Sequence, residues 1–255
     1  MGEQADFPSI EIIYGRAFGH PNKEFAIFLI IFMIASMIFD MHVHTTFSPC
    51  SRMCVDEAVA AAGQSGLDGI CITDHDTMSI RHVLTEGLQE NGVVVIFGME
   101  YTTSRGDFLV FGPFEALEPG LSADRLLRIV DQSSGIAIAA HPFRKDRPVD
   151  GRIIQDGCCR VIESLNGRNT ATENAAVQGW CDDYDLTECG GSDAHTIEEV
   201  GNFATRFFVP VRTRSDLVAA LKNRLCRPED RTVEGLLVPD SRHCFIQAES
   251  GASYR

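Results

Sequence analysis

The sequence predicts an α/β domain built around parallel strands, and two observations support this prediction. From residue 38 onward, short apolar runs alternate with stretches that have a helical pattern. Polar residues of the kinds found in functional sites follow these runs, as they do at the carboxyl ends of strands in parallel α/β folds. The chain has 255 residues, of which 44% are hydrophobic and 23% charged, so it can form one globular domain of this class.

The expected strands and helices follow one another without an internal repeat. The expected strands are Ile38–His42, Gly69–Thr73, Val93–Phe97, Phe108–Phe111, Ile136–Ala140, Arg160–Glu163, Leu186–Cys189 and Phe203–Val209. The expected helices are Val55–Ser65, Ser79–Glu90, Ala123–Gln132, Ala171–Cys181 and Ser215–Arg224. Gly69 and Gly92 follow the first two helices, where a glycine commonly ends a helix.

Three segments are expected along the chain. These are an N-terminal extension (1–36), a main domain (37–228) and a peripheral C-terminal tail (229–255). An apolar run at residues 25–39 is short for a membrane-spanning helix, which needs about 20 residues. It is interpreted as a signal-peptide core, a weak membrane anchor or sequence outside the native product, and the lack of a cleavage site disfavours the first. Met37 is a candidate native start, held on equal terms with an anchor or an added element.

Charge and cysteine content favour a reduced, cytoplasmic setting and a small substrate. The formal net charge of -14 opposes non-specific binding to nucleic-acid backbones, so no stable nucleic-acid partner is expected. A small anionic substrate held by metal ions remains compatible with this charge. The nine cysteines are odd in number and scattered, which is typical of free cytosolic thiols. The alternative location is a membrane surface, reached through residues 25–39.

The first polar motif is His42-Val43-His44, at the end of the first expected strand. Alternate residues of a strand lie on one face, so the two imidazoles can bind one cation together. An isolated pair with this spacing is usually a chance occurrence. This motif alone therefore does not indicate a metal site, and the prediction depends on the motifs that follow it.

The second and third motifs add a histidine and a carboxylate. Asp74-His75-Asp76 follows the second expected strand, and either aspartate has an ordinary role as a helix cap, whereas His75 has none. Glu100 comes at the end of another strand, where a salt bridge or a surface position is the ordinary alternative. A glutamate among several histidines is suited to bridging two cations.

The last two motifs are Ala140-His141-Pro142 and the glycine-rich run that ends in Asp193-Ala194-His195. Alone, His141 is equally well interpreted as a core histidine with a hydrogen bond. The glycines before Asp193 allow close approach of the backbone. Five of the eight histidines lie in these motifs, so the sequence predicts a multinuclear metal site.

Taken in order, H-x-H, T-D-H-D, G-x-E, A-H-P and G-S-D-A-H resemble the PHP domain, the polymerase and histidinol phosphatase family, from Phe39 to about Pro228. Smaller elements, such as the run from Ile162 to Asn169, look like the short, stand-alone members. The resemblance implies a distorted (β/α)7 TIM-like barrel that holds two or three divalent metals. It also implies metal-dependent hydrolysis of phosphomonoesters or phosphodiesters.

The resemblance implies a role for each ligand position. His42, His44, Glu100 and Asp193 would hold one metal, Glu100 would bridge to a second metal shared with His141, and a third metal would be held by His75 and His195. The chain departs from the family pattern twice. It has Ser48-Pro49-Cys50 where many relatives have S-D-G, whose aspartate is a ligand, so the third site is expected to be weaker or differently ligated.

The second departure is Asp107, which stands where many relatives have a ligand histidine. A carboxylate there favours manganese or iron over zinc. Cys50 is not counted as a ligand, because a free cysteine near a loop is more often a small apolar residue.

The expected reaction is hydrolysis of a small phosphate ester, a phosphorylated metabolite or a nucleotide, through a metal-activated hydroxide. Asp74 is a candidate base or orienting group, and His195 a candidate proton donor to the leaving oxygen. Arg144 and Arg168 are candidate phosphate ligands, for which a solvated surface position is equally ordinary. Two rivals remain: an amidohydrolase-type C–N hydrolase, and a non-catalytic metal-binding accessory module. The oligomeric state is not predicted.

Overall fold

A computed structural model describes residues 36–232. The strands are β1 (Met37–Val43), β2 (Gly69–Ile72), β3 (Gly87–Leu88), β4 (Val94–Phe97), β5 (Met99–Thr103), β6 (Gly106–Phe111), β7 (Ile136–Ala139), β8 (Val161–Asn166), β9 (Thr187–Gly191), β10 (Phe203–Phe207) and β11 (Cys226–Asp230). The helices are α3 (Val55–Gln64), η1 (Ser79–His82), α4 (Ala123–Asp131), α5 (Gly151–Gln155), α6 (Ala171–Asp183), η2 (Ile197–Glu199) and α7 (Arg214–Lys222). The expectations for residues 1–35 and 233–255 lie outside the described residues.

The strands form two mixed sheets. One has the order β11-β10-β1-β2-β4-β3 and the other β5-β6-β7-β8-β9. Parallel pairing joins β1, β2 and β4 in the first sheet, and β7, β8 and β9 in the second. The α/β class is therefore confirmed, but the expectation of parallel strands throughout is wrong. The chain turns back directly between β5 and β6, β10 runs antiparallel to β1, and β11 runs antiparallel to β10 at the edge of the sheet.

The two sheets meet at two places near the ends of β1 and β2. Val43 bridges Ala194, just after β9, and His75 bridges Glu100 in β5. Only Gly98 separates β4 in the first sheet from β5 in the second. These links bring the carboxyl ends of strands from both sheets to one place.

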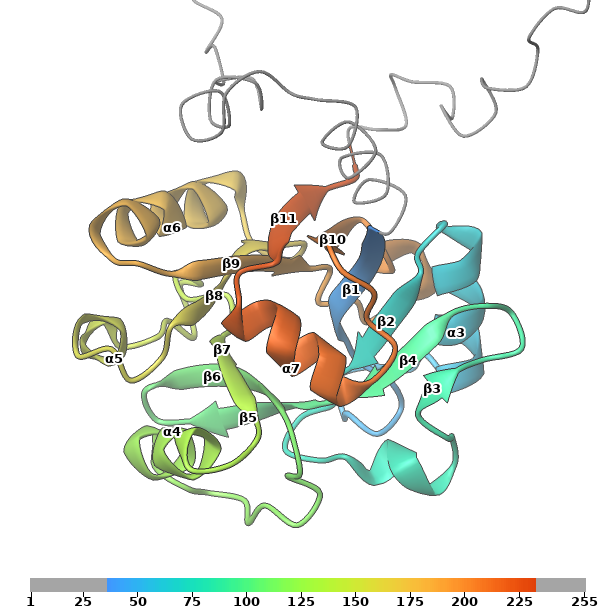
Figure 1. The fold of residues 1–255 in the computed structure, drawn as a ribbon, viewed down its shortest axis with the longest axis horizontal. Coiled ribbons are helices and arrows are strands. Elements are labelled where there is room, and N and C mark those ends of the chain that lie inside the picture. Colours follow the sequence, from blue (N-terminus) through green and yellow to red (C-terminus); the bar gives the residue numbers. More distant parts are fainter. Residues whose placement is uncertain (1–35, 233–255) are drawn as a thin grey trace, which may run out of the picture.

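The opposite ends of the strands are covered by α7, which crosses in front of them in Figure 1. Leu217 and Leu221 of α7 are fully buried in one apolar cluster with Phe39, Ile136 and Val161, which begin or lie near the start of their strands. The remaining α-helices lie around the outside of the strands (Figure 1). Because α7 closes one end, only the other end of the strands is free to carry a site.

The expected helix at Ser79–Glu90 is wrong. The chain forms the single turn η1 and then the short strand β3. Ile80 is buried, but two other apolar residues of the segment are exposed, Val83 at 62% and Leu88 at 73%. Gly87 has a φ of 118°, which is outside helical geometry, and the Glu86 carboxylate instead accepts a hydrogen bond from Phe97 N at 2.8 Å.

Four further elements were not expected from the sequence: β5, α5, η2 and β11. Strand β11 includes Pro228, paired with Thr205 of β10, so the strand passes the position expected as the end of the main domain. Proline is compatible with this place because β11 is an edge strand. Within residues 36–232, no helix is long and apolar enough to cross a membrane.

Candidate metal centre

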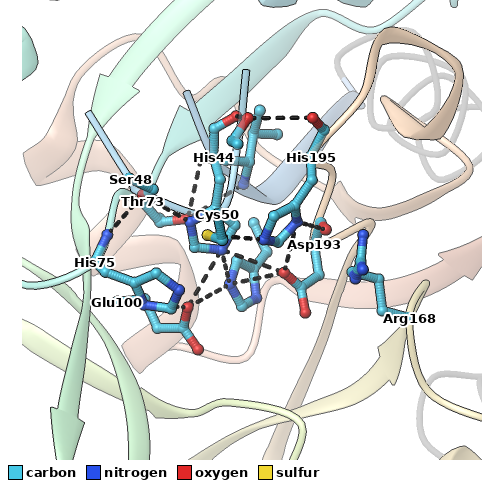
Figure 2. Close-up of polar contacts among 12 residues, drawn as sticks. His44, Ser48, Cys50, Thr73, His75, Glu100, Arg168, Asp193 and His195 are labelled. Carbon is cyan, nitrogen blue, oxygen red and sulfur yellow. Dashed lines mark hydrogen bonds and ion pairs between the residues drawn. The ribbon is translucent and has the colours of Figure 1, made fainter. Parts of the chain in front are cut away.

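The side chains of the five sequence motifs meet at the carboxyl ends of the strands. His42 lies within β1 and His44 directly after it, whereas His75 and His141 follow β2 and β7. Asp193 and His195 follow β9, and Glu100 enters from β5 beside the bridge to His75. In Figure 2 the side chains of His44, His75, Glu100, Asp193 and His195 gather in one place.

These side chains form three linked groups whose nitrogen, oxygen and sulfur donor atoms lie within 4.8 Å of one another. The groups are His42 with Glu100 and His141, His42 with His44 and Asp193, and His44 with Cys50, His75 and His195. The first two share His42 and the last two share His44. Such an arrangement of nitrogen and carboxylate donors can hold several cations side by side.

The distances within the inner two groups are short. His42 Nε2 lies 3.3 Å from Glu100 Oε2, and His44 Nε2 lies 3.2 Å from Asp193 Oδ1. His141 Nε2 lies 2.8 Å from the other oxygen of Glu100. Each oxygen of Glu100 therefore faces a different histidine, as a carboxylate that bridges two cations requires.

Three imidazoles are oriented by a partner on Nδ1, so that Nε2 is the nitrogen each neutral ring would offer to a metal. His42 Nδ1 donates to Glu163 Oε1 at 3.0 Å, and His195 Nδ1 donates to the Asp193 carbonyl at 2.8 Å. Ser48 Oγ donates to Asp74 Oδ1 at 2.6 Å, so it accepts from His44 Nδ1 at 3.2 Å. An imidazole fixed in this way presents the nitrogen that a metal needs.

The buried carboxylates give the inner site a strong preference for positive charge. Burial alone would lower the pKa of the His42 imidazole, but Asp193, Glu163 and Glu100 outweigh it and hold the pKa well above its usual value. Burial raises the pKa values of Glu100 and Asp193, yet the neighbouring histidines bring both below the ordinary range. A divalent cation would satisfy the same carboxylates while the histidines bind it as neutral imidazoles.

The pKa values of the outer histidines His75 and His195 shift in the opposite direction from those of His42 and His44. Burial lowers the pKa values of both His75 and His195, and the nearby His44 imidazole lowers them further, so both rings are neutral at neutral pH. A neutral imidazole is the form that binds a metal.

The backbone carries strain at two of the predicted ligands. His141 has a φ of 29° and Asp193 a φ of 54°, both in the left-handed region that non-glycine residues rarely adopt. The His141 amide is held by a hydrogen bond to Glu163 Oε2 at 2.8 Å. Strain of this kind persists where the surrounding structure fixes it, and it is concentrated at functional sites.

The residues present fit bound divalent cations. Among the described residues, His141 Nδ1, His75 Nδ1 and Asp107 Oδ2 are buried without a hydrogen-bond partner. His75 Nδ1 lies 3.1 Å from Glu100 Oε2 and Asp107 Oδ2 lies 3.1 Å from Arg147 Nη1, so both still have a charged neighbour. Imidazole and carboxylate donors together suit manganese, iron and zinc.

Asp74 is held by hydrogen bonds, which is compatible with the orienting role expected for it, whereas Asp107 lies apart from the other predicted ligands. Asp74 accepts hydrogen bonds from Thr45 N and Thr45 Oγ1, both at 2.7 Å, and from Ser48 Oγ. These bonds occupy both carboxylate oxygens and fix the loop after β1. Asp107 lies outside the three groups and faces Arg147.

The two predicted phosphate ligands lie at the rim but have carboxylate partners. Arg144 Nη2 donates to Asp193 Oδ2 at 2.7 Å and also to Asn166 Oδ1 at 2.7 Å. Arg168 Nη1 lies 3.1 Å from Glu199 Oε1, and its side chain is 42% exposed. Arg144 thus orients the ligand Asp193, and Arg168 is the freer of the two.

Sequence reasoning missed Glu163 as a functional residue. Its carboxylate is fully buried and accepts hydrogen bonds from His42 Nδ1, His141 N and Asn166 Nδ2. The available signal was a carboxylate inside an apolar strand, because a charged residue in such a strand needs buried partners. Asn166, from the same strand, was missed as well.

The comparison with protein families identifies the class of this fold and site. The PHP domain model matches residues 40–147, and the model described as PHP-associated matches residues 171–226. The chain belongs to the PHP domain family.

One sequence relative is an uncharacterised protein of Methanocaldococcus jannaschii. It is 30% identical over 115 residues, which cover 41% of this chain and 67% of that protein. A second protein of the same organism, also uncharacterised, is 25% identical over 184 residues, covering 66% of this chain and 69% of that protein.

Solved structures share the fold at low identity. PsfC from Pseudomonas syringae is 20% identical, with a TM-score of 0.64 over 79% of this chain and 96% of that chain. A two-domain protein from Bacteroides vulgatus, described as containing a predicted PHP-like metal-dependent phosphoesterase, is 22% identical, with a TM-score of 0.57 over 76% and 65%. The lesion-specific endonuclease PfuEndoQ from Pyrococcus furiosus is 16% identical, with a TM-score of 0.56 over 76% and 57%.

Proposed function

We propose that the protein is a metal-dependent phosphoesterase that hydrolyses a small phosphate ester, a phosphorylated metabolite or a nucleotide. The observation that carries this proposal is the three linked groups of donor atoms, which share His42 and His44 at the carboxyl ends of the strands. Membership of the PHP family supports it. So does the likeness to the Bacteroides vulgatus protein, described as containing a predicted metal-dependent phosphoesterase.

The proposal includes the barrel expected from the family resemblance. In it, the two sheets are the two parts of one distorted (β/α)7 barrel. Support comes from the Val43–Ala194 and His75–Glu100 bridges, which link the sheets, and from α7, which covers the opposite end of the strands.

Two to three divalent cations are proposed at the centre. His42, His44, Glu100 and Asp193 would hold one, and Glu100 with His141 a second, with His75 and His195 available for a third. Bound cations there would supply Lewis acidity, lowering the pKa of a water and neutralising charge on phosphate oxygens. The proposed preference for manganese or iron over zinc assumes that Asp107 is a metal ligand. Asp107 would then have to give up its ion pair with Arg147 when the metal binds.

The remaining roles belong to side chains at the rim. The Arg168 guanidinium, partly exposed, is placed to bind phosphate oxygens, and Arg144 is placed to do so while it holds Asp193. His195, with Nδ1 fixed and 15% of its side chain exposed, is the proposed proton donor to the leaving oxygen. Asp74 acts by orienting the loop that carries Ser48, because its oxygens are already occupied.

The small substrate and cytoplasmic setting are proposed from composition. A net charge of -14 opposes long phosphate backbones. The fold itself does not exclude nucleic acids, since PfuEndoQ is an endonuclease of this fold. Amidohydrolase chemistry is disfavoured because Lys145 lies in a loop after β7 and Lys222 ends α7, so neither lysine is on a strand near the site.

The test uses purified full-length protein, an aryl phosphate substrate and added Mn²⁺. Replacement of His42 or Glu100 by alanine is expected to abolish metal-dependent turnover, whereas His82→Ala, which removes an exposed histidine of η1, keeps it. Elemental analysis gives the metal content of each form. Bound metal without turnover on a broad panel of phosphate esters would instead favour the non-catalytic module.

A further inference from the structure

Cys50 lies at the outer edge of the metal centre, and it is not the small apolar residue that the sequence suggested. The residue is exposed, and its Sγ lies 3.1 Å from His195 Nε2. It belongs to the group with His44, His75 and His195, in which all donor atoms lie within 4.8 Å of one another. Figure 2 shows its sulfur between the His44 and His195 rings.

The loop that carries Cys50 is fixed on both sides. Ser51 Oγ lies 3.1 Å from the His44 carbonyl and also 3.1 Å from the His195 carbonyl. The turn before it is closed by a hydrogen bond from Ser51 N to Ser48 O at 3.1 Å. The Ser51 hydroxyl thus links the loop that carries Cys50 to the backbone of both His44 and His195. The position of the thiol is therefore fixed without a bound cation.

Three of the four side chains, His75, His195 and Cys50, remain for a cation of the outer group once His44 is assigned to the inner site. His195 Nδ1 donates to a carbonyl, so the Nε2 lone pair faces Cys50 Sγ. His44 also uses Nδ1 as a donor, and its Nε2 lies 3.2 Å from both Glu100 and Asp193, inside the inner site. One nitrogen lone pair binds one cation, which leaves His75, His195 and Cys50 for the outer position.

We propose that Cys50 binds a divalent cation as a thiolate, together with His75 and His195. The family resemblance implies a ligand aspartate at the position of Pro49, and Cys50, the next residue, would supply a donor in its place. The proposal rests on the metal-dependent function above and defines the chemistry of its third site. On binding, the Cys50 S–H bond breaks, the sulfur keeps the electron pair for the metal, and the proton passes to solvent.

A site with one thiolate and two imidazoles has its own selectivity. Three protein ligands leave a position open for water or substrate, the usual form of a catalytic zinc site. Thiolate favours zinc, cobalt or ferrous iron over manganese and magnesium, whereas the inner donors are rich in carboxylate. The centre is therefore expected to hold unlike metals, with the softer ion on the exposed side.

The test uses the full-length protein, stripped of metal by a chelator and titrated with Co²⁺. A thiolate ligand gives a sulfur-to-cobalt charge-transfer absorption in the near ultraviolet, which we expect in the wild type and not in Cys50→Ser. Cys158→Ser is the matched control, because Cys158 is also exposed but follows α5 and is absent from the metal groups. Equal absorption in wild type and Cys50→Ser overturns the proposal.

A second measurement needs no variant. Alkylation of each cysteine is followed by mass spectrometry with and without Zn²⁺, and zinc is expected to protect Cys50 but not Cys158. Equal rates at Cys50 in both conditions contradict the proposal. Neither measurement depends on hydrolysis. If both effects are seen but the protein hydrolyses no phosphate ester, the Cys50 site is supported and only the proposed phosphoesterase function is refuted.

Cys50→Asp tests whether the outer site needs a thiolate or only a donor atom at this position. An aspartate restores a donor of the kind relatives use, so this variant is expected to keep a third bound metal while losing the charge-transfer absorption. Its zinc affinity at the outer site is expected to fall about 10–100-fold, with a smaller change for manganese. Equal loss of both metals, or unchanged zinc affinity, contradicts a thiolate ligand.

Discussion

Replacing Glu163 by glutamine tests whether a residue that no motif marks controls metal binding. Glu163 Oε1 accepts from His42 Nδ1 at 3.0 Å. Glu163 Oε2 accepts from His141 N at 2.8 Å and from Asn166 Nδ2 at 2.9 Å. All three partners are donors, so a carboxylate satisfies them and an amide, which has one NH₂ group, does not.

Both orientations of the glutamine amide carry a cost. If NH₂ faces His42, the imidazole must move its proton to Nε2, the nitrogen that would bind the metal. If NH₂ faces His141 and Asn166, two buried donors lose their acceptor. Each unsatisfied buried group costs about 1–3 kcal/mol, and loss of the partner of a ligand histidine typically lowers metal affinity about 10–100-fold.

The measurement is Mn²⁺ binding to metal-free protein by calorimetry, with thermal unfolding as a check on folding. Glu188→Gln is the control, because Glu188 lies on the neighbouring strand β9, paired with Ile162, and is outside the metal groups. We expect Glu163→Gln to bind about 10–100-fold more weakly and the control to bind as the wild type does. A folded Glu163→Gln protein with wild-type affinity would refute the assigned role of Glu163.

Three further perturbations test how the site is held. Asp40→Asn should destabilise the fold by about 2–3 kcal/mol in urea unfolding, because every partner of the Asp40 carboxylate is a hydrogen-bond donor and the new amide group would leave some of them without an acceptor. These donors are Ser192 Oγ, Ser192 N, Gly201 N and His42 N. Unchanged stability would contradict this prediction. Gly191→Ala should cost about 1–3 kcal/mol and weaken metal binding, since the added Cβ would lie 2.6 Å from His42 Cβ; normal metal affinity would show that His42 does not move. Removal of metal by a chelator should lower the melting temperature by roughly 5–10 °C when the metal had been present at about 100 times its Kd, and an unchanged melting temperature would argue against a bound metal.

The sequence picked out most of the side chains that meet at the strand ends, because metal chemistry restricts residue type. Only a few side chains bind transition metals, so His42, His44 and His141 stand out beside their apolar strands. The positions of the core strands were predicted for the same kind of reason, since burial on both faces demands continuous apolar runs. These are local signals that a single sequence retains.

The failures involve contacts that the spacing of apolar residues does not show. Apolar spacing predicted a helix after Ser79. The Glu86 carboxylate instead accepts a hydrogen bond from Arg214, which is far along the chain, and this contact holds the segment in a non-helical conformation. Strand β5 was missed because its antiparallel pairing with β6 depends on a tight turn and not on an apolar run. Neither partner could be identified from spacing alone.

The residues that position the ligands were the hardest to predict, and the reason is physical. A ligand must offer a particular atom to the metal, whereas its support needs only an acceptor at the right place. Glu163 and Asp40 meet that need as buried carboxylates that collect donors from two or more strand ends. Both therefore connect β1 to other strands and orient His42 at the same time, so we expect the stability of the fold and the affinity for metal to depend on the same two carboxylates.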